Sequence, residues 1–343
     1  MESFGFPLEA VVVLFVVVAA SVWCDLFSHR NSTEIKFKDA LGWSIFWVAL
    51  AIAFYAYLYL RYDAKWADLF LTGYVLEKTL SVDNMMVFIA IFASFGIKGA
   101  LQHRVLYYGI IGALLFRAIF IAVGTSLFGL SVWVEFIFGL IVAWTAVMML
   151  KGGGDDEETE DYSNHWSVSW TKKLIPVLPR LSGNHFFVKH NEVETLKAND
   201  PSLNVVGKAA FYATPLFLCL ICIEISDIVF SFDSVPAIIA VTEEPFLIYA
   251  AVIFAILGLR NLYFMLAVAA KYLCHLEKAV AFVLFFIAFK LCAQAAEHIW
   301  GFSIEISHSL SLFIVLGTIA LGVVASIVFP EKEEPNSKES EVV

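Results

Sequence analysis

Two short segments of the chain combine acidic and small polar residues at the same spacing, inside stretches that are otherwise apolar. They are residues 77–84 and 227–234. In each, an acid is followed six positions later by an aspartate, with a serine two positions before that aspartate. A carboxylate at the bilayer centre costs about 2.5–3.5 kcal/mol on insertion scales, so such residues usually serve a function. Because the pattern occurs twice, we interpret these acids as a functional site.

Helical geometry places most of each pattern on one stripe. At about 100° per residue, Ser81 and Asn84 lie within about 60° of each other and on either side of Glu77. The second segment repeats these angles. Asp83 and Asp233 each fall about 120° from their stripe, so either they face another helix or the helix unwinds there.

Pro236 favours unwinding in the second segment. Its ring removes a backbone N–H and clashes with the carbonyl of Phe232. Freed carbonyls at membrane depth are tolerated only inside protein or in a watery cavity. There they could bind a cation, so we expect a helix broken near Asp233.

Glu224 adds a fifth acid to this set. Sites rich in hard oxygen donors suit Mg²⁺, Ca²⁺ or Mn²⁺. The predicted metal ligands are Glu77, Asp83, Asn84, Glu224, Asp227, Asp233 and Ser234. The alternative is a static network of buried ion pairs with Arg117, Arg260 and Lys290. Such a network would not account for the matching spacing in both segments.

The amino-acid composition distinguishes a membrane protein from a soluble one. Hydrophobic residues make up 60% and charged residues 16%, whereas soluble domains carry about 25% charged residues. We therefore expect an all-α polytopic membrane protein whose first partner is the lipid bilayer. The net charge of −10 argues against nucleic acid as a partner. We expect a transporter rather than an enzyme, with a divalent cation as cargo and no catalytic cofactor.

Apolar runs long enough to cross a bilayer predict nine transmembrane helices. They lie near 8–27, 40–60, 68–95, 104–128, 132–150, 209–241, 246–269, 278–297 and 308–329. Most Lys and Arg residues outside these runs fall in the loops on one side, and only Arg61 and Lys65 fall on the other. The positive-inside rule then places the N-terminus outside and the C-terminus inside a bacterial-type inner membrane.

Similarities between the two halves extend beyond the acids. The sequence around Arg117 resembles that around Arg260, and Lys151 and Lys290 end corresponding stretches. Helices three to five thus repeat as helices six to eight, and an odd number per repeat inverts the second copy, as in many secondary transporters. The predicted segments are 1–67 (two helices), 68–150 (first repeat), 151–208 (acidic cytoplasmic loop), 209–297 (second repeat) and 298–343 (last helix and tail).

Two further features leave alternatives open. The loop begins with three glycines and the acidic block 155–161, which is typical of a solvated connector. It could instead recruit soluble stress proteins, which would make the protein a membrane scaffold with a structural metal site. The Cys219–Cys222 spacing matches C-x-x-C but lies on an apolar helix. The two thiols either pack as small buried hydrophobic groups or serve a redox role. Homo-oligomerisation is also open.

Residues 71–84, 224–238 and 254–260 resemble the signatures of the TerC integral membrane family, and the resemblance covers nearly the whole chain. It implies a place among cation and amino-acid exporters with paired three-helix repeats. It also implies a link to tellurite resistance and metal homeostasis, with manganese efflux as the activity. The direction of transport comes from this resemblance alone. Carried over by position, the acidic residues are Glu77, Asp83, Glu224, Asp227 and Asp233, with Asn84 and Ser234 beside them.

Overall fold

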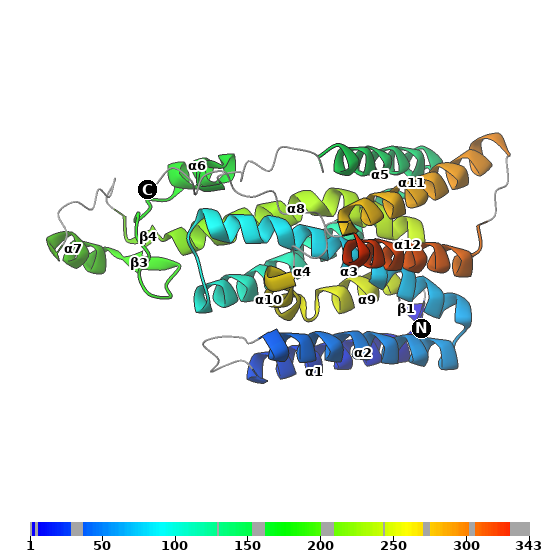
Figure 1. The fold of residues 1–343 in the computed structure, drawn as a ribbon, viewed down its shortest axis with the longest axis horizontal. Coiled ribbons are helices and arrows are strands. Elements are labelled where there is room, and N and C mark those ends of the chain that lie inside the picture. The colour runs from blue at the N-terminus through cyan, green and yellow to red at the C-terminus, as the bar shows by residue number, and fades with distance from the viewer. Residues whose placement is uncertain are drawn as a thin grey trace.

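The structure is a computed structural model of the chain, dominated by helices that run along one long axis (Figure 1). It describes residues 2–3, 6–28, 37–128, 130–152, 162–199, 209–242, 244–269, 275–301 and 306–329. The α-helices are α1 (Leu8–Ser28), α2 (Phe37–Arg61), α3 (Ala64–Ser94), α4 (Ala100–Phe128), α5 (Val132–Gly152), α6 (Trp166–Leu174), α7 (His190–Asn199), α8 (Pro215–Val241), α9 (Pro245–Ile256), α10 (Leu259–Ala269), α11 (Leu276–Trp300) and α12 (His308–Val328).

The short elements form two small antiparallel pairs. Strands β1 (Glu2–Ser3) and β2 (Phe6–Pro7) pair at the N-terminus, with Ser3 opposite Phe6. Strands β3 (Phe187–Lys189) and β4 (Phe211–Ala213) pair with Val188 opposite Tyr212. A 3₁₀ turn, η1, covers Tyr162–Asn164.

Helices cover most of each of the nine apolar runs, and the membrane class is confirmed. Within the described ranges, six helices are long and apolar enough to cross a membrane, and the bent pair α9–α10 makes a seventh if it counts as one span. Helix α3 is not among them because charged residues such as Glu77 and Asp83 interrupt its apolar sequence. Helix α1 contributes only the shorter apolar stretch Leu8–Ser21. Nine spans therefore remain a prediction.

The distribution of side chains is that of a membrane protein. Large apolar residues face outward along the helices, for example Phe15 at 73% and Leu60 at 84% exposure. Charged residues are buried between the helices, including Glu77, Arg117 and Asp227. An exterior of large apolar side chains suits lipid as the surrounding solvent, with charged groups turned toward the bundle interior.

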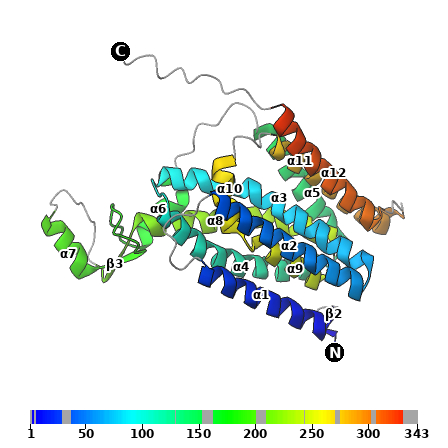
Figure 2. The same ribbon diagram turned by 60° about the horizontal axis from the view of Figure 1, so that its bottom comes forward.

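Helix α3 lies at the centre and contacts α2, α8, α9 and α12. Figures 1 and 2 show α5, α11 and α12 on one side of the bundle and α1 and α2 on another. The closest pairings are α5 with α11, α4 with α8, and α3 with α9. If α3, α4 and α5 are exchanged for α8, α9 and α11, the pair α3–α9 becomes α8–α4 and the pair α5–α11 is unchanged. Such symmetric pairing is expected of two related three-helix units, while their opposite orientation in the membrane stays a prediction.

The expected break near Asp233 is wrong, and the break lies elsewhere. Helix α8 continues through Pro236 to Val241, and every residue from Ser234 to Val241 is buried. Neighbouring helices around a transmembrane proline allow the helix to continue. The run 246–269, predicted as one helix, instead bends by 52° between α9 and α10. Gly258 lies at this bend with φ +77°, and Trp47 of α2 packs directly against it.

Replacing Gly258 with alanine is expected to destabilise the protein by two separate effects. The left-handed backbone conformation costs about 1–3 kcal/mol for a residue with a side chain. A Cβ would also overlap the Trp47 ring, which adds about 1–3 kcal/mol of overpacking. Gly301→Ala is the matched control, because Gly301 has φ +74° but nothing within 4 Å of its Cβ position. Thermal unfolding in detergent should show the larger loss for Gly258→Ala; equal losses would contradict the Trp47 contact.

The segment between the two repeats is more structured than a plain connector. Helix α6, strand β3 and helix α7 all lie in it, and they extend from one end of the bundle (Figure 1). The predicted helix from residue 209 starts only at Pro215, because Phe211–Ala213 pair with β3 instead. Proline at the first helical position is favourable, since its missing N–H has no intrahelical partner there. The acidic block 155–161 lies outside the described residues.

Candidate functional site

The two acidic segments form the same local structure on two central helices. Glu77 on α3 is fully buried, and Asp227 on α8 is 6% exposed. Ser81 donates its hydroxyl to the Glu77 carbonyl at 2.7 Å, and Ser231 donates to the Asp227 carbonyl at 2.8 Å. Each serine thus satisfies its hydroxyl one turn back in its own helix. The predicted stripe is confirmed in both copies, and both helices stay regular through it.

Arg117 of α4 joins the two copies. Its Nη1 binds Glu77 Oε2, its Nη2 lies 3.2 Å from Asp227 Oδ1, and its Nε lies 3.5 Å from Asp227 Oδ2. The guanidinium therefore grips Asp227 with two nitrogens and still reaches Glu77. Arg117 is itself only 2% exposed. One cation shared by two buried carboxylates leaves the group with excess negative charge.

The remaining acids extend this pair into a series of neighbouring carboxyl groups. Glu224 lies near Asp227, and Asp233 lies near both Glu77 and Asp83. The order of neighbours is Glu224, Asp227, Glu77, Asp233 and Asp83, and we call these five residues the acid chain. It passes from α8 to α3, back to α8 and again to α3, so it follows the contact between these two helices.

Glu277 continues the acid chain at the end that Asp83 occupies. It lies in the first turn of α11, near Asp83. Sequence reasoning did not propose it, because an acid near a predicted helix end reads as a group that reaches the head groups. Only the packing of α11 against the other helices brings it toward Asp83.

Several polar atoms of the site have no hydrogen-bond partner among the described residues. They are Glu77 Oε1, Glu224 Oε2 and Ser234 Oγ, and all three are buried. Buried polar atoms are nearly always satisfied, and exceptions often mark a place for water or an ion. The Glu224 carboxylate fits directly against Gly112 of α4, where any Cβ would overlap it. Glycine at 112 therefore makes room for an acid between α4 and α8.

A small cavity lies beside the shared cation. Arg117 and Asp227 line it together with Gly109 and Ala113 of α4, and apolar side chains complete the wall. Its volume is about 20 Å³, which is room for about one water molecule. A water or a small cation could therefore reach the Arg117–Asp227 pair without a large rearrangement.

The structure does not gather the seven predicted ligands at one point. Within the described ranges, no group of three or more His, Cys, Asp or Glu side chains is close enough to hold a metal ion. Glu77 and Asp227 meet through Arg117, Asp83 and Asp233 are half-buried neighbours, and Glu224 faces Gly112. Asn84 and Ser234 are buried on their stripes, at 6% and 1% exposure. Metal ligation by these residues stays a prediction.

Lys78 has a role that the sequence did not indicate. Its Nζ donates to the carbonyls of Ala255 at 3.0 Å and Leu257 at 3.4 Å. These carbonyls lie at the C-terminal end of α9, where helical hydrogen bonds stop and the helix dipole favours a cation. A lysine beside Glu77 on α3 thus caps the bend between α9 and α10. Nothing in the local sequence connects positions so far apart.

An apolar bundle with a chain of acids and a shared arginine in its interior defines a polytopic helical membrane protein with a built polar site. The chain belongs to the family described as "Integral membrane protein TerC family", which matches residues 62–334. Both acidic segments lie within that match, so the resemblance noted from the sequence is confirmed.

Similar proteins cover nearly the full length. The chain is 52% identical over 340 residues to "Tellurium resistance protein TerC" of Alcaligenes sp and 51% identical to the protein of that name from Serratia marcescens, with 98% of each chain covered. It is 36% identical to "Putative membrane-bound redox modulator Alx" of Escherichia coli K12, over 83% of this chain and 85% of that protein. No solved structure matches the chain.

Proposed function

We propose that this protein transports divalent cations across the membrane, with Mn²⁺ leaving the cytoplasm as its cargo, and that this transport underlies the link to tellurium resistance in its relatives' names. The observation that carries the proposal is the acid chain: five acidic side chains that neighbour one another on two regular helices inside an apolar bundle. Such an arrangement is costly unless a cation visits it. Oxygen donors of this kind suit Mn²⁺.

In this proposal Arg117 is a tethered cation that stands in for the cargo. It neutralises part of the charge on Glu77 and Asp227 while no metal is bound. An arriving divalent cation competes for these oxygens, and the unpartnered Glu77 Oε1 and Glu224 Oε2 supply further donors. Protons compete for the same oxygens, so release of the metal is proposed to be coupled to proton binding.

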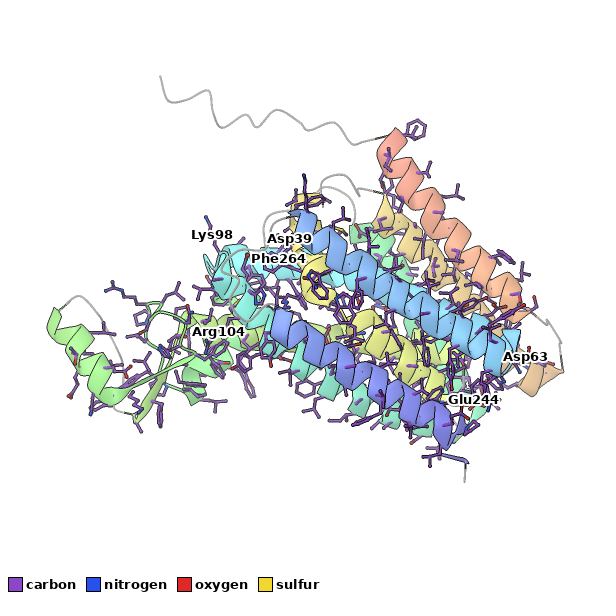
Figure 3. All side chains as sticks on the ribbon, turned by 90° about the horizontal axis from the view of Figure 1, so that it is seen from below. Asp39, Asp63, Lys98, Arg104, Glu244 and Phe264 are labelled. Atoms are coloured by element: carbon purple, nitrogen blue, oxygen red, sulfur yellow. The ribbon has the colours of Figure 1, made fainter. Side chains whose placement is uncertain are left out.

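The proposed orientation places the basic end of the bundle in the cytoplasm. Figure 3 shows Lys98 and Arg104 at one end and Asp63 and Glu244 at the other. The positive-inside rule assigns the first end to the cytoplasm of a bacterial inner membrane. The nine-span, N-out topology and the inverted direction of the two repeats belong to the same proposal.

Uptake of radiolabelled Mn²⁺ into inverted membrane vesicles tests the proposal. Vesicles with the protein are expected to accumulate Mn²⁺ faster than matched vesicles without it, and an imposed pH gradient is expected to change that rate. Equal rates with and without the protein would refute transport. Protein-dependent uptake that ignores the pH gradient would refute only the coupling.

A redox function is the second candidate, because relatives carry the name of a membrane-bound redox modulator. The relevant thiols are Cys219 and Cys222, which are free and almost fully buried on α8. Cys222 Sγ lies 3.3 Å from the Ser167 hydroxyl of α6. Buried thiols of this kind behave as small hydrophobes. The scaffold alternative rests on the acidic block 155–161, about which the described residues say nothing.

The variant Cys219→Ala/Cys222→Ala is expected to keep both Mn²⁺ uptake and tellurite resistance. The reason is that these side chains pack in an apolar cluster and take no part in the acid chain. Growth on tellurite and vesicle uptake measure the two properties separately. Cys292→Ala serves as the control for loss of a thiol outside the pair. Loss of resistance in the double variant alone, with uptake retained, would favour the redox function.

A further inference from the structure

Helix α6 presents an apolar face that the bundle does not cover. Trp166, Trp170 and Leu174 are 56%, 65% and 76% exposed. They are four residues apart, so on an α-helix they lie within an arc of about 80°. Trp166 contacts the ring of His165, at 5.4 Å between centroids, and its remaining surface is open. We call these three residues the apolar arc of α6.

The remaining surface of α6 divides into a packed side and a basic side. Ser167, Val168 and Thr171 are buried, and they occupy the arc next to the apolar one. Lys172 and Lys173 are exposed on the opposite side of the apolar arc, together with Ser169. A helix with one face on protein, one apolar and one basic fits a boundary between an apolar and a polar phase.

Contacts with α8 and with the end of α3 fix the position of α6 along the bundle. Val168 packs in the same cluster as Cys219 and Cys222 of α8, and the Ser167 hydroxyl meets Cys222 Sγ at 3.3 Å. Cys222 lies about 10 Å along α8 from its first residue, so α6 lies beside an apolar part of that helix. The η1 turn just before α6 is tied to the end of α3, where the Tyr162 N–H donates to Ser94 Oγ at 3.2 Å. Figure 1 places α6 beside the ends of α3 and α8.

We infer that α6 is an interfacial helix, whose apolar arc inserts between the lipids of the leaflet next to Lys98 and Arg104 and whose two lysines bind anionic head groups. Tryptophan is enriched at this depth because its amphipathic ring suits the head-group region. Basic residues beside an apolar face add attraction to anionic lipid. The occupant is a phospholipid surface, and the inference is independent of the transport proposal.

Photo-cross-linking of the full-length protein in lipid vesicles tests this inference. A benzophenone amino acid replaces Trp170 in one variant and Ser169 in the matched control, because these adjacent exposed residues lie on different sides of α6. The vesicles contain phosphatidylcholine and phosphatidylglycerol, with a clickable phospholipid as the tracer. We expect several-fold more lipid adduct from position 170 than from 169, as an inserted apolar arc requires. Equal adduct would overturn the inference.

Two further arms separate the other outcomes. Lys172→Gln/Lys173→Gln is expected to lower the adduct from position 170 in vesicles with anionic lipid and to leave it unchanged in pure phosphatidylcholine. An unchanged adduct in both would overturn the head-group contact. In intact cells, a position-170 adduct to a soluble protein in place of lipid would overturn the inference in favour of a docking surface. The same probe at Leu174 repeats the comparison should position 170 not express.

Discussion

Inverted vesicles that carry Asp233→Asn or Asp83→Asn are expected to take up Mn²⁺ about 10–100-fold more slowly than vesicles with the unchanged protein. Asp233 is the member of the acid chain that faces Glu77 and Asp83 together. Exchanging its carboxylate for an amide keeps the size and removes the negative charge. A divalent cation would then meet a weaker set of oxygen donors at the contact between α3 and α8.

Asp68→Asn is the matched control for this prediction. Asp68 lies on α3 like Asp83 and is the more deeply buried of the two, and it accepts hydrogen bonds from Tyr55 at 3.3 Å and Ser309 at 2.7 Å. These contacts place it outside the acid chain, so its uptake should stay close to that of the unchanged protein. Detergent size-exclusion profiles establish that each variant inserts and folds. Full uptake in both chain variants would remove these aspartates from the transport site.

Arg117→Met is expected to destabilise the protein by about 3–5 kcal/mol, the usual result of removing one partner from a buried ion pair. Glu77 and Asp227 would lose their shared cation while they remain buried between α3 and α8. Arg61→Met is the control. Its ion pair with Glu9 also measures 3.2 Å, but both side chains are more than half exposed. An exposed pair is screened by water and contributes little to stability, so thermal unfolding should separate the two variants clearly.

The same variant also tests Arg117 as a stand-in for the cargo. Adding Glu77→Gln and Asp227→Asn to Arg117→Met should recover much of the lost stability, because the two groups that lost their shared cation no longer carry a charge. Mn²⁺ should raise the unfolding temperature of Arg117→Met more than that of the unchanged protein, because no guanidinium competes for the carboxylates. A smaller Mn²⁺ effect in Arg117→Met would mean that the arginine helps the metal to bind.

Much of the architecture follows from local pattern. Apolar runs correctly predicted a helical membrane protein, since crossing a bilayer demands length and hydropathy that a sequence displays directly. The stripe around Glu77 followed from helical periodicity alone. The matching spacing of residues 227–234 correctly predicted a second stripe around Asp227.

The errors arose where distant residues decide the local structure. Pro236 predicts a break only if the surrounding helices leave its neighbours unsatisfied, and α8 is enclosed there. Gly258 in an apolar run is tolerated within many helices, so the bend depends on Trp47 and Lys78, both far away in the sequence. The choice of Arg117 among three buried cations and the approach of Glu277 to Asp83 are likewise tertiary facts. Helical periodicity does not indicate which residues of distant helices come into contact.

Adjacent residues of α3 connect the acid chain with the bend between α9 and α10. Glu77 holds Arg117, and Lys78 holds the carbonyls at the α9–α10 bend. Both side chains leave the same turn of one rigid rod, so a rotation of α3 that frees Glu77 also withdraws Lys78. In the transport proposal, a cation that binds Glu77 by such a rotation would therefore also change the α9–α10 bend. A probe that reports the angle between α9 and α10 would then report indirectly on cation binding at Glu77 and Asp227.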